Sequence, residues 1–113
     1  MARFTLVAFS NPIDGKMKEF GTWYDKTHIP DMLEVPGVVT AQRFQLLRLV
    51  PSKAFRQRYL CLYEFEAEDE QSAKAIIDTL NAQNLPLSDA LDVSSVTLAV
   101  YQAAGPRLAK GKE

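Results

Sequence analysis

The sequence is poor in the residues that build disulfide and metal sites. Among 113 residues it has one cysteine, Cys61, and one histidine, His28. A single cysteine excludes an internal disulfide framework and a cysteine zinc cluster, and one histidine with scattered carboxylates does not supply the usual set of metal ligands. The strand context of Cys61 indicates a buried thiol, which fits a reducing compartment. We therefore expect no metal site.

An excess of charge of one sign and a long apolar run are lacking as well. The 13 Lys and Arg residues nearly balance the 14 Asp and Glu residues, so nothing indicates a nucleic acid or an anionic membrane as a partner. No run approaches the roughly 20 apolar residues that span a bilayer. The N-terminus lacks the apolar stretch and the cleavage pattern of a signal peptide. We expect a cytoplasmic location.

What is present is the pattern of one α+β domain. Strand formers and helical spacing alternate along the chain, separated by turn signals such as Ser10-Asn11-Pro12. They predict strands at 3–9, 38–50, 58–66 and 94–101, and helices at 14–28 and from the acidic residues 68–70 to about residue 80. The order β-α-β-β-α-β is ferredoxin-like, with an antiparallel sheet and two helices on one face. We expect a single domain over residues 1–104 and a flexible tail over 105–113.

Apolar residues occupy both faces of the predicted strands, although two helices can cover only one face. In the first strand, Phe4 and Leu6 fill one face while Val7 and Phe9 fill the other. The third and fourth strands show the same two-sided pattern. A second apolar face needs a partner, and the commonest solution for a small domain is an identical sheet across a two-fold axis. The sequence therefore predicts a homodimer formed through the uncovered sheet faces.

One stretch, residues 20–33, holds the only Trp and the only His together with Pro30. At about 100° per residue, one helical face carries four residues that we expect to be buried: Met17, Phe20, Tyr24 and His28. Pro30 lacks an N–H and disfavours the α region at the residue before it, so we expect the helix to end at His28. This places a titratable ring in the wall of a cavity between the helix and the sheet.

The motif Trp23-Tyr24-Asp25-x-x-His28-x-Pro30-Asp31, followed by Pro36-Gly37-Val38 and Arg43-Phe44, resembles the dimeric α/β barrel superfamily and, within it, the EthD-like domains. The resemblance implies two ferredoxin-like protomers whose sheets pack into a barrel, each with a pocket between its sheet and its helices. The superfamily includes cofactor-free monooxygenases, muconolactone isomerases, polyketide cyclases and haem proteins, and many EthD-like domains have no assigned reaction. The resemblance therefore implies the fold and does not choose the function.

The resemblance also bears on cofactors. Where family members use a histidine of the first helix, the matching position is His28. Haem-binding branches usually take their axial histidine from the second helical region, and residues 69–93 contain none. We therefore expect no haem and no other cofactor. Tyr24 and Asp31 match the accompanying motif positions, without a general role that transfers to them.

His28 is the candidate general base or acid, because an unperturbed pKa near 6.5 suits proton transfer at neutral pH. The alternative is a helix-terminal histidine that bonds to a carbonyl or to Asp31. Tyr24, one turn earlier, is either a catalytic partner or a core aromatic residue. Asp31 either orients the imidazole and favours its charged form or caps a turn.

Two further side chains are candidates for ligand binding. Trp23 is placed to stack on a flat substrate or to anchor an interface. Arg43 is placed to hold a substrate carboxylate or phenolate, although a pair with Glu64 or Glu66 on the neighbouring strand is the favoured alternative.

The sequence thus predicts a cofactor-independent enzyme acting on a small apolar, aromatic or cyclic metabolite. The reaction would be a proton-transfer isomerisation, cyclisation or lyase cleavage, or an oxygenation that needs no flavin. A Gly-rich phosphate loop, a Ser or Cys nucleophile motif and a CxxC pair are all absent from the sequence. The alternative is a non-catalytic ligand-binding or accessory protein with the same pocket, and a third option is a structural dimer with a vestigial pocket.

Overall fold

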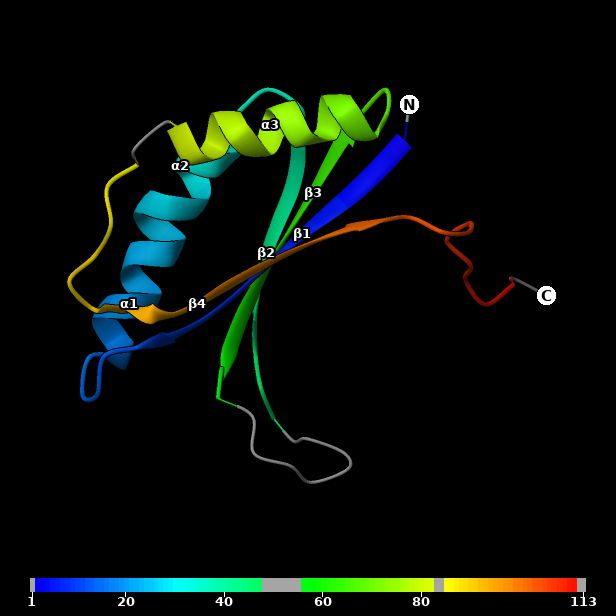
Figure 1. Ribbon diagram of the computed structural model, residues 1–113. Coiled ribbons are helices and arrows are strands. Elements are labelled where there is room, and N and C mark those ends of the chain that lie inside the picture. The colour runs from blue at the N-terminus through cyan, green and yellow to red at the C-terminus, as the bar shows by residue number, and fades with distance from the viewer. Residues whose placement is uncertain (1, 48–55, 83–84, 112–113) are drawn as a thin grey trace.

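The computed structural model describes residues 2–47, 56–82 and 85–111. Along them lie β1 (Ala2–Pro12), α1 (Met17–Trp23), the π-helical turn η1 (Tyr24–His28), α2 (Ile29–Leu33), β2 (Val38–Gln45), β3 (Tyr59–Ala67), α3 (Glu70–Ala82) and β4 (Leu91–Gln102). The strands form one antiparallel sheet in the order β2-β3-β1-β4. The helices lie on one side of this sheet (Figure 1). The predicted α+β, ferredoxin-like fold is confirmed.

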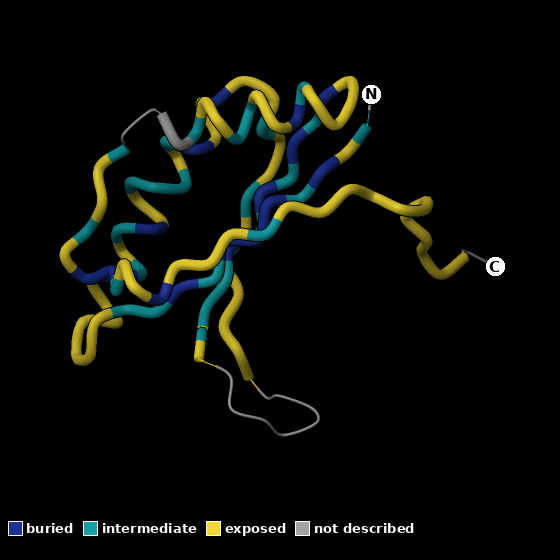
Figure 2. The backbone as a smooth tube through the Cα atoms, viewed as in Figure 1, coloured by how far each residue is buried: buried dark blue, intermediate teal, exposed yellow. Residues whose placement is uncertain are grey.

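The core lies between the helices and the two central strands. The register pairs Phe4 with Phe65, Leu6 with Tyr63 and Ala8 with Cys61, and all of these residues are buried on the helix side. Figure 2 shows buried positions gathered along these two strands. The Phe4 and Phe65 rings stack with centroids 5.6 Å apart. This alternation follows from the strand period of two, which sends every second side chain to the same face.

The first helical segment does not end at His28, as the sequence predicts, but continues to Leu33 through the π turn. The Ile29 N–H donates to the Tyr24 carbonyl, five residues back, which is the π-helical pattern. Pro30 explains the wider turn, because in a regular α-helix its ring would clash with the carbonyl four residues back. The chain turns into β2 at Gly37, where φ is 95° and a Cβ would lie 2.9 Å from the Cδ1 atom of Ile76.

The start of this segment also differs from the prediction. The helix begins at Met17 rather than at residue 14, because Gly15 adopts a φ of 81° in the preceding turn. Met17 is 59% exposed, so its predicted burial is wrong. The Tyr59 hydroxyl donates to the Met17 sulfur at 2.7 Å. Phe20 and Tyr24 are buried, as predicted.

Two strands differ in length from the predicted ones. β2 ends at Gln45, and the last predicted strand residues, 48–50, lie outside the described part of the chain, as does most of the predicted loop 51–57. β4 begins at Leu91, earlier than predicted, because a register shift opposite Ser10 accommodates the extra residues. The Ser95 hydroxyl accepts the Asn11 N–H at 2.7 Å and donates to the Asp92 carbonyl at 2.6 Å. These bonds satisfy backbone groups that the bulge leaves out of the ladder.

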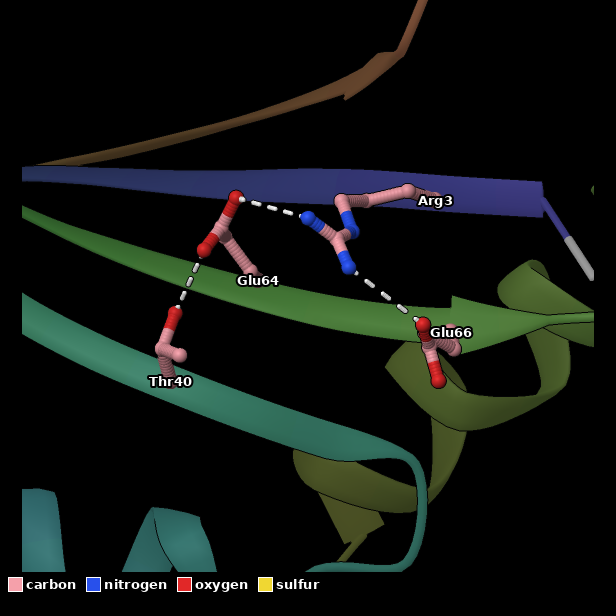
Figure 3. A network of polar contacts seen from close by, with 4 residues as sticks. All are labelled: Arg3, Thr40, Glu64 and Glu66. Carbon is pink, nitrogen blue, oxygen red and sulfur yellow. Dashed lines mark hydrogen bonds and ion pairs between the residues drawn. The ribbon is translucent and has the colours of Figure 1, made fainter. Parts of the chain in front are cut away.

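The sheet face away from the helices is apolar in its centre and polar at one end. The register places Val7 between Leu62 and Ala99 on this face. At the polar end Arg3 lies 3.9 Å from Glu64 and 3.4 Å from Glu66, and Thr40 donates to Glu64 at 2.8 Å (Figure 3). The described residues beyond β4, 103–111, are exposed and form neither helix nor strand.

Two absences concern the described residues only. They include no helix that is long and apolar enough to cross a membrane. They also include no group of three or more His, Cys, Asp or Glu side chains arranged to hold a metal ion.

Candidate functional site

A cavity of about 360 Å³ lies between the first helical segment, α3 and the helix side of the sheet. Its wall is mainly apolar and includes Leu6, Ala8, Met32, Ile77, Leu80, Leu85, Leu87 and Leu91. The polar side chains in the wall belong to Ser10, Trp23, Tyr24, His28 and Tyr63. A largely apolar cavity of this size with a few polar groups is typical of a small-molecule site. A larger hollow of about 620 Å³ between α3 and β4 contains none of these five residues.

His28 is the titratable side chain of this wall that changes charge near neutral pH. Its ring stacks on Trp23, with centroids 4.6 Å apart, and meets Tyr24 edge-on at 5.4 Å. Its Nδ1 atom is buried and has no hydrogen-bond partner among the described residues. The alternative that this atom bonds to a carbonyl or to Asp31 is therefore not realised among the described residues. Burial lowers the pKa of His28 from its ordinary value, and the charge of Asp31 only partly opposes this, so the ring is neutral at pH 7.

Tyr24 lies one turn from His28 on the predicted face. Its hydroxyl is 3.4 Å from the Ser10 hydroxyl, and its ring meets Phe20 edge-on at 5.1 Å. Burial raises the pKa of Tyr24, although the bond to Ser10 acts in the opposite direction. Tyr24 is therefore a protonated phenol whose hydroxyl already has a partner within the protein.

Tyr63 is a cavity residue that the sequence analysis missed. It is 1% exposed, and its ring lies edge-on to His28 with centroids 6.4 Å apart. Its hydroxyl is buried and has no hydrogen-bond partner among the described residues. Burial raises the pKa of Tyr63 far above its ordinary value, so the phenol stays protonated. The strand alternation that groups Tyr63 with Cys61 and Phe65 indicates its burial, and a buried tyrosine hydroxyl usually needs a partner.

Trp23 connects the helix to the chain segment that precedes β4. Its indole Nε1–H donates to the Pro86 carbonyl at 3.1 Å. Leu85 and Leu87, on either side of Pro86, belong to the cavity wall. Trp23 thus holds part of the wall in place while its ring supports the imidazole of His28.

Asp31 and Arg43 do not line the cavity. The Arg43 guanidinium binds Asp25 through two bonds, Nε to Oδ1 at 2.9 Å and Nη2 to Oδ2 at 3.2 Å, and it lies 5.7 Å from the centroid of the Tyr24 ring. The favoured pairing of Arg43 with Glu64 or Glu66 is therefore wrong. The reason is register, because Arg43 lies opposite Cys61 on the helix side, whereas Glu64 pairs with Thr5 on the other face.

Two solved structures are similar to this one. An ethyl tert-butyl ether D (EthD) family protein from Bacillus halodurans C-125 has a TM-score of 0.57 and 14% sequence identity, over 96% of this chain and 100% of its own. A candidate monooxygenase from Shewanella loihica PV-4 has a TM-score of 0.53 and 16% identity, over 94% of this chain and 99% of its own. The chain shares its fold with these two proteins. No protein-family model and no curated protein matches the sequence.

The fold thus places one neutral imidazole and two protonated phenols in the wall of an apolar cavity. A neutral imidazole can accept a proton, and a phenol with a raised pKa can donate a hydrogen bond without losing its own proton. In an apolar environment both interactions are stronger than in water. The arrangement is suited to moving a proton on a molecule that also carries an oxygen.

Proposed function

We propose that the protein is a cofactor-independent enzyme that transfers protons on small, largely apolar, aromatic or cyclic metabolites. The observation that carries the proposal is the state of His28. Its imidazole belongs to the cavity wall, burial lowers its pKa, and its Nδ1 atom has no hydrogen-bond partner among the described residues, which leaves the neutral ring able to serve a ligand. A structural histidine would normally have at least one bonded nitrogen.

The step is a proton abstraction next to a carbonyl. His28 takes a proton from the carbon, and the electron pair of that C–H bond forms a C=C bond while the carbonyl oxygen becomes an enolate. A hydrogen bond from a phenol stabilises the charge that develops on this oxygen. In a β,γ-unsaturated carbonyl compound the enolate is conjugated, so the imidazolium can return its proton to the γ-carbon while the C=C bond moves to the α,β position, which isomerises the substrate without any oxidant or reductant.

The experiment follows deuterium exchange from D₂O into acetophenone, cyclohexanone and a β,γ-unsaturated γ-lactone by NMR. We expect the wild type to accelerate exchange into at least one probe. His28→Phe keeps an aromatic ring against Trp23 and should lower the rate by about 10²- to 10⁴-fold, the usual loss for a positioned base. Tyr59→Phe, which lies outside the cavity wall, is the matched control and should leave the rate unchanged.

A correctly folded His28→Phe protein with full activity would refute the catalytic role. A non-catalytic ligand-binding protein is the alternative function, since it would use the same cavity. Probe binding without any exchange by the wild type would favour that alternative. The candidate monooxygenase among the similar structures does not decide between them, because one fold supports many reactions.

A further inference from the structure

The Tyr63 hydroxyl is a buried donor to which the described residues offer no well-placed oxygen or nitrogen acceptor. A buried polar group without a hydrogen bond destabilises a fold, and most such groups in native proteins are bonded. The nearby Tyr24 hydroxyl shows the usual arrangement, because it lies 3.4 Å from Ser10. Tyr63 is 1% exposed and lines the cavity, and its hydroxyl has no hydrogen bond of ordinary geometry among the described residues. The Cys61 thiol interacts with this hydroxyl, but a thiol is only a weak acceptor. An oxygen atom of a bound ligand would be a stronger acceptor for this hydroxyl than a thiol is.

The wall of the cavity also restricts the charge of that partner. No Lys, Arg, Asp or Glu side chain of the described residues contributes to it. The guanidinium of Arg43 is bound by Asp25 outside the cavity. A carboxylate or phosphate in this cavity would therefore lose its hydration without gaining a counter-ion, which is strongly unfavourable. The cavity favours an uncharged ligand.

We propose that Tyr63 is a specificity-determining residue, which donates a hydrogen bond to the carbonyl or hydroxyl oxygen of an uncharged, ring-sized ligand. His28 lies beside Tyr63 in the same wall, since the two rings meet edge-on with centroids 6.4 Å apart, so one ligand can face both side chains. The cavity volume of about 360 Å³ suits one or two rings. This inference rests on the proposed function and names its substrate class, namely neutral aryl or cyclic ketones and phenols rather than carboxylic acids.

The experiment measures the dissociation constants of three probes of similar shape, acetophenone, ethylbenzene and benzoate, by NMR titration. We expect acetophenone to bind the wild type about threefold to tenfold more tightly than ethylbenzene, the factor that one net hydrogen bond supplies. Benzoate should bind more weakly than both. In Tyr63→Phe, acetophenone should bind no better than ethylbenzene, and the affinity for ethylbenzene should stay at the wild-type value.

Tyr59→Phe is the matched control, because its hydroxyl donates to the Met17 sulfur outside the cavity wall. It should keep the preference for acetophenone. The melting temperature checks folding, and Tyr63→Phe should melt at or above the wild-type temperature because it removes an unpaired buried hydroxyl.

Three outcomes would overturn the inference. They are an unchanged acetophenone preference in Tyr63→Phe, equal binding of acetophenone and ethylbenzene to the wild type, and no binding of either probe. These outcomes leave the proposed function testable on its own, because that test compares exchange rates in His28→Phe and does not depend on Tyr63. Loss of exchange in His28→Phe with an unchanged preference in Tyr63→Phe would retain the base and reject the specificity residue.

Discussion

Trp23 and His28 are five residues apart, and their rings stack with centroids at 4.6 Å and an interplanar angle of 23°. In a regular α-helix, residues five apart point in directions that differ by about 140°. The π turn Tyr24–His28 brings the two side chains onto the same side. Such turns are often found at functional sites. The position of the candidate base therefore depends on a local distortion of the helix, which in turn depends on Pro30.

The Trp23–His28 stack predicts a pH-dependent fluorescence signal. Trp23 is the only tryptophan, and a protonated imidazole quenches a stacked indole more strongly than a neutral one. Because burial lowers the pKa of His28 from 6.5, the emission should stay constant above that pH and fall at a midpoint below it. His28→Phe should abolish the transition. A midpoint above pH 6.5 would show that a charge interaction, and not burial, controls this histidine.

The lowered pKa of His28 also makes the free energy of unfolding depend on pH. The unfolded imidazole binds a proton near pH 6.5, whereas the folded one resists protonation until the pH is lower. The free energy of unfolding should therefore be constant with respect to this group above pH 6.5 and should decrease as the pH falls toward the folded pKa. Denaturant unfolding of the wild type and of His28→Phe across this window isolates the contribution of His28.

A third prediction concerns Pro30. Replacing it by Ala supplies the missing N–H and removes the ring that prevents a regular turn, so Pro30→Ala should raise the stability by about 1 kcal/mol. It should also disturb the Trp23–His28 stack, which would change the Trp emission and lower the deuterium-exchange rate. Pro36→Ala, outside the helical segment, is the control. An unchanged emission spectrum in Pro30→Ala would show that other contacts fix the π turn.

Hydrophobic alternation and helical spacing predict the element order, the sheet and the burial of Phe20 and Tyr24, because these depend on which face of an element meets the core. They do not predict the π turn. The local effect of Pro30 on an isolated helix predicts that the helix ends at His28. Met32 is only 5% exposed, and its packing into the core keeps the chain helical beyond Pro30. Tertiary burial here outweighs a local preference.

The sequence predicts the sheet face on which a residue lies better than it predicts the partner of its side chain. Acidic residues lie on the strand next to Arg43, but Arg43 is on the helix side of the sheet and therefore binds Asp25 of the helical segment. The strand pattern places Tyr63 on the buried face, but alternation does not predict whether its hydroxyl has a hydrogen-bond acceptor. A buried polar group without a hydrogen-bond partner can be identified only when the positions of all its neighbours are known.

A fourth prediction distinguishes a structural role of Arg43 from a role in ligand binding. Asp25 is exposed, so a double-mutant cycle with Arg43→Met and Asp25→Asn should give a coupling of only about 0.5 kcal/mol, which decreases with added salt. Because Arg43 lies outside the cavity wall, Arg43→Met should not change the affinity for acetophenone. A weaker affinity with unchanged stability would restore the ligand-positioning role that the sequence suggests.

The last prediction is that two copies of the chain associate through the sheet faces that the helices leave uncovered. On this face Phe44 is 41% exposed and lies opposite Leu60, and Tyr101 is 59% exposed and lies opposite Thr5. A stable interface needs at least about 1,200 Å² of total buried area. We expect sedimentation velocity to show a dimer at micromolar concentration. A wild-type monomer at that concentration would reject the prediction.

Phe44→Glu tests which face is used, because it places an unpaired charge within the proposed contact, where burial without a partner is strongly unfavourable. The variant should sediment as a folded monomer. Leu33→Glu is the matched control, since Leu33 is 42% exposed but lies on α2, on the helix side of the sheet. If Leu33→Glu dissociates the dimer and Phe44→Glu does not, the helices form the interface. In that case the apolar centre around Val7 needs another explanation, because we predict a dimer on the ground that this uncovered apolar face must be buried.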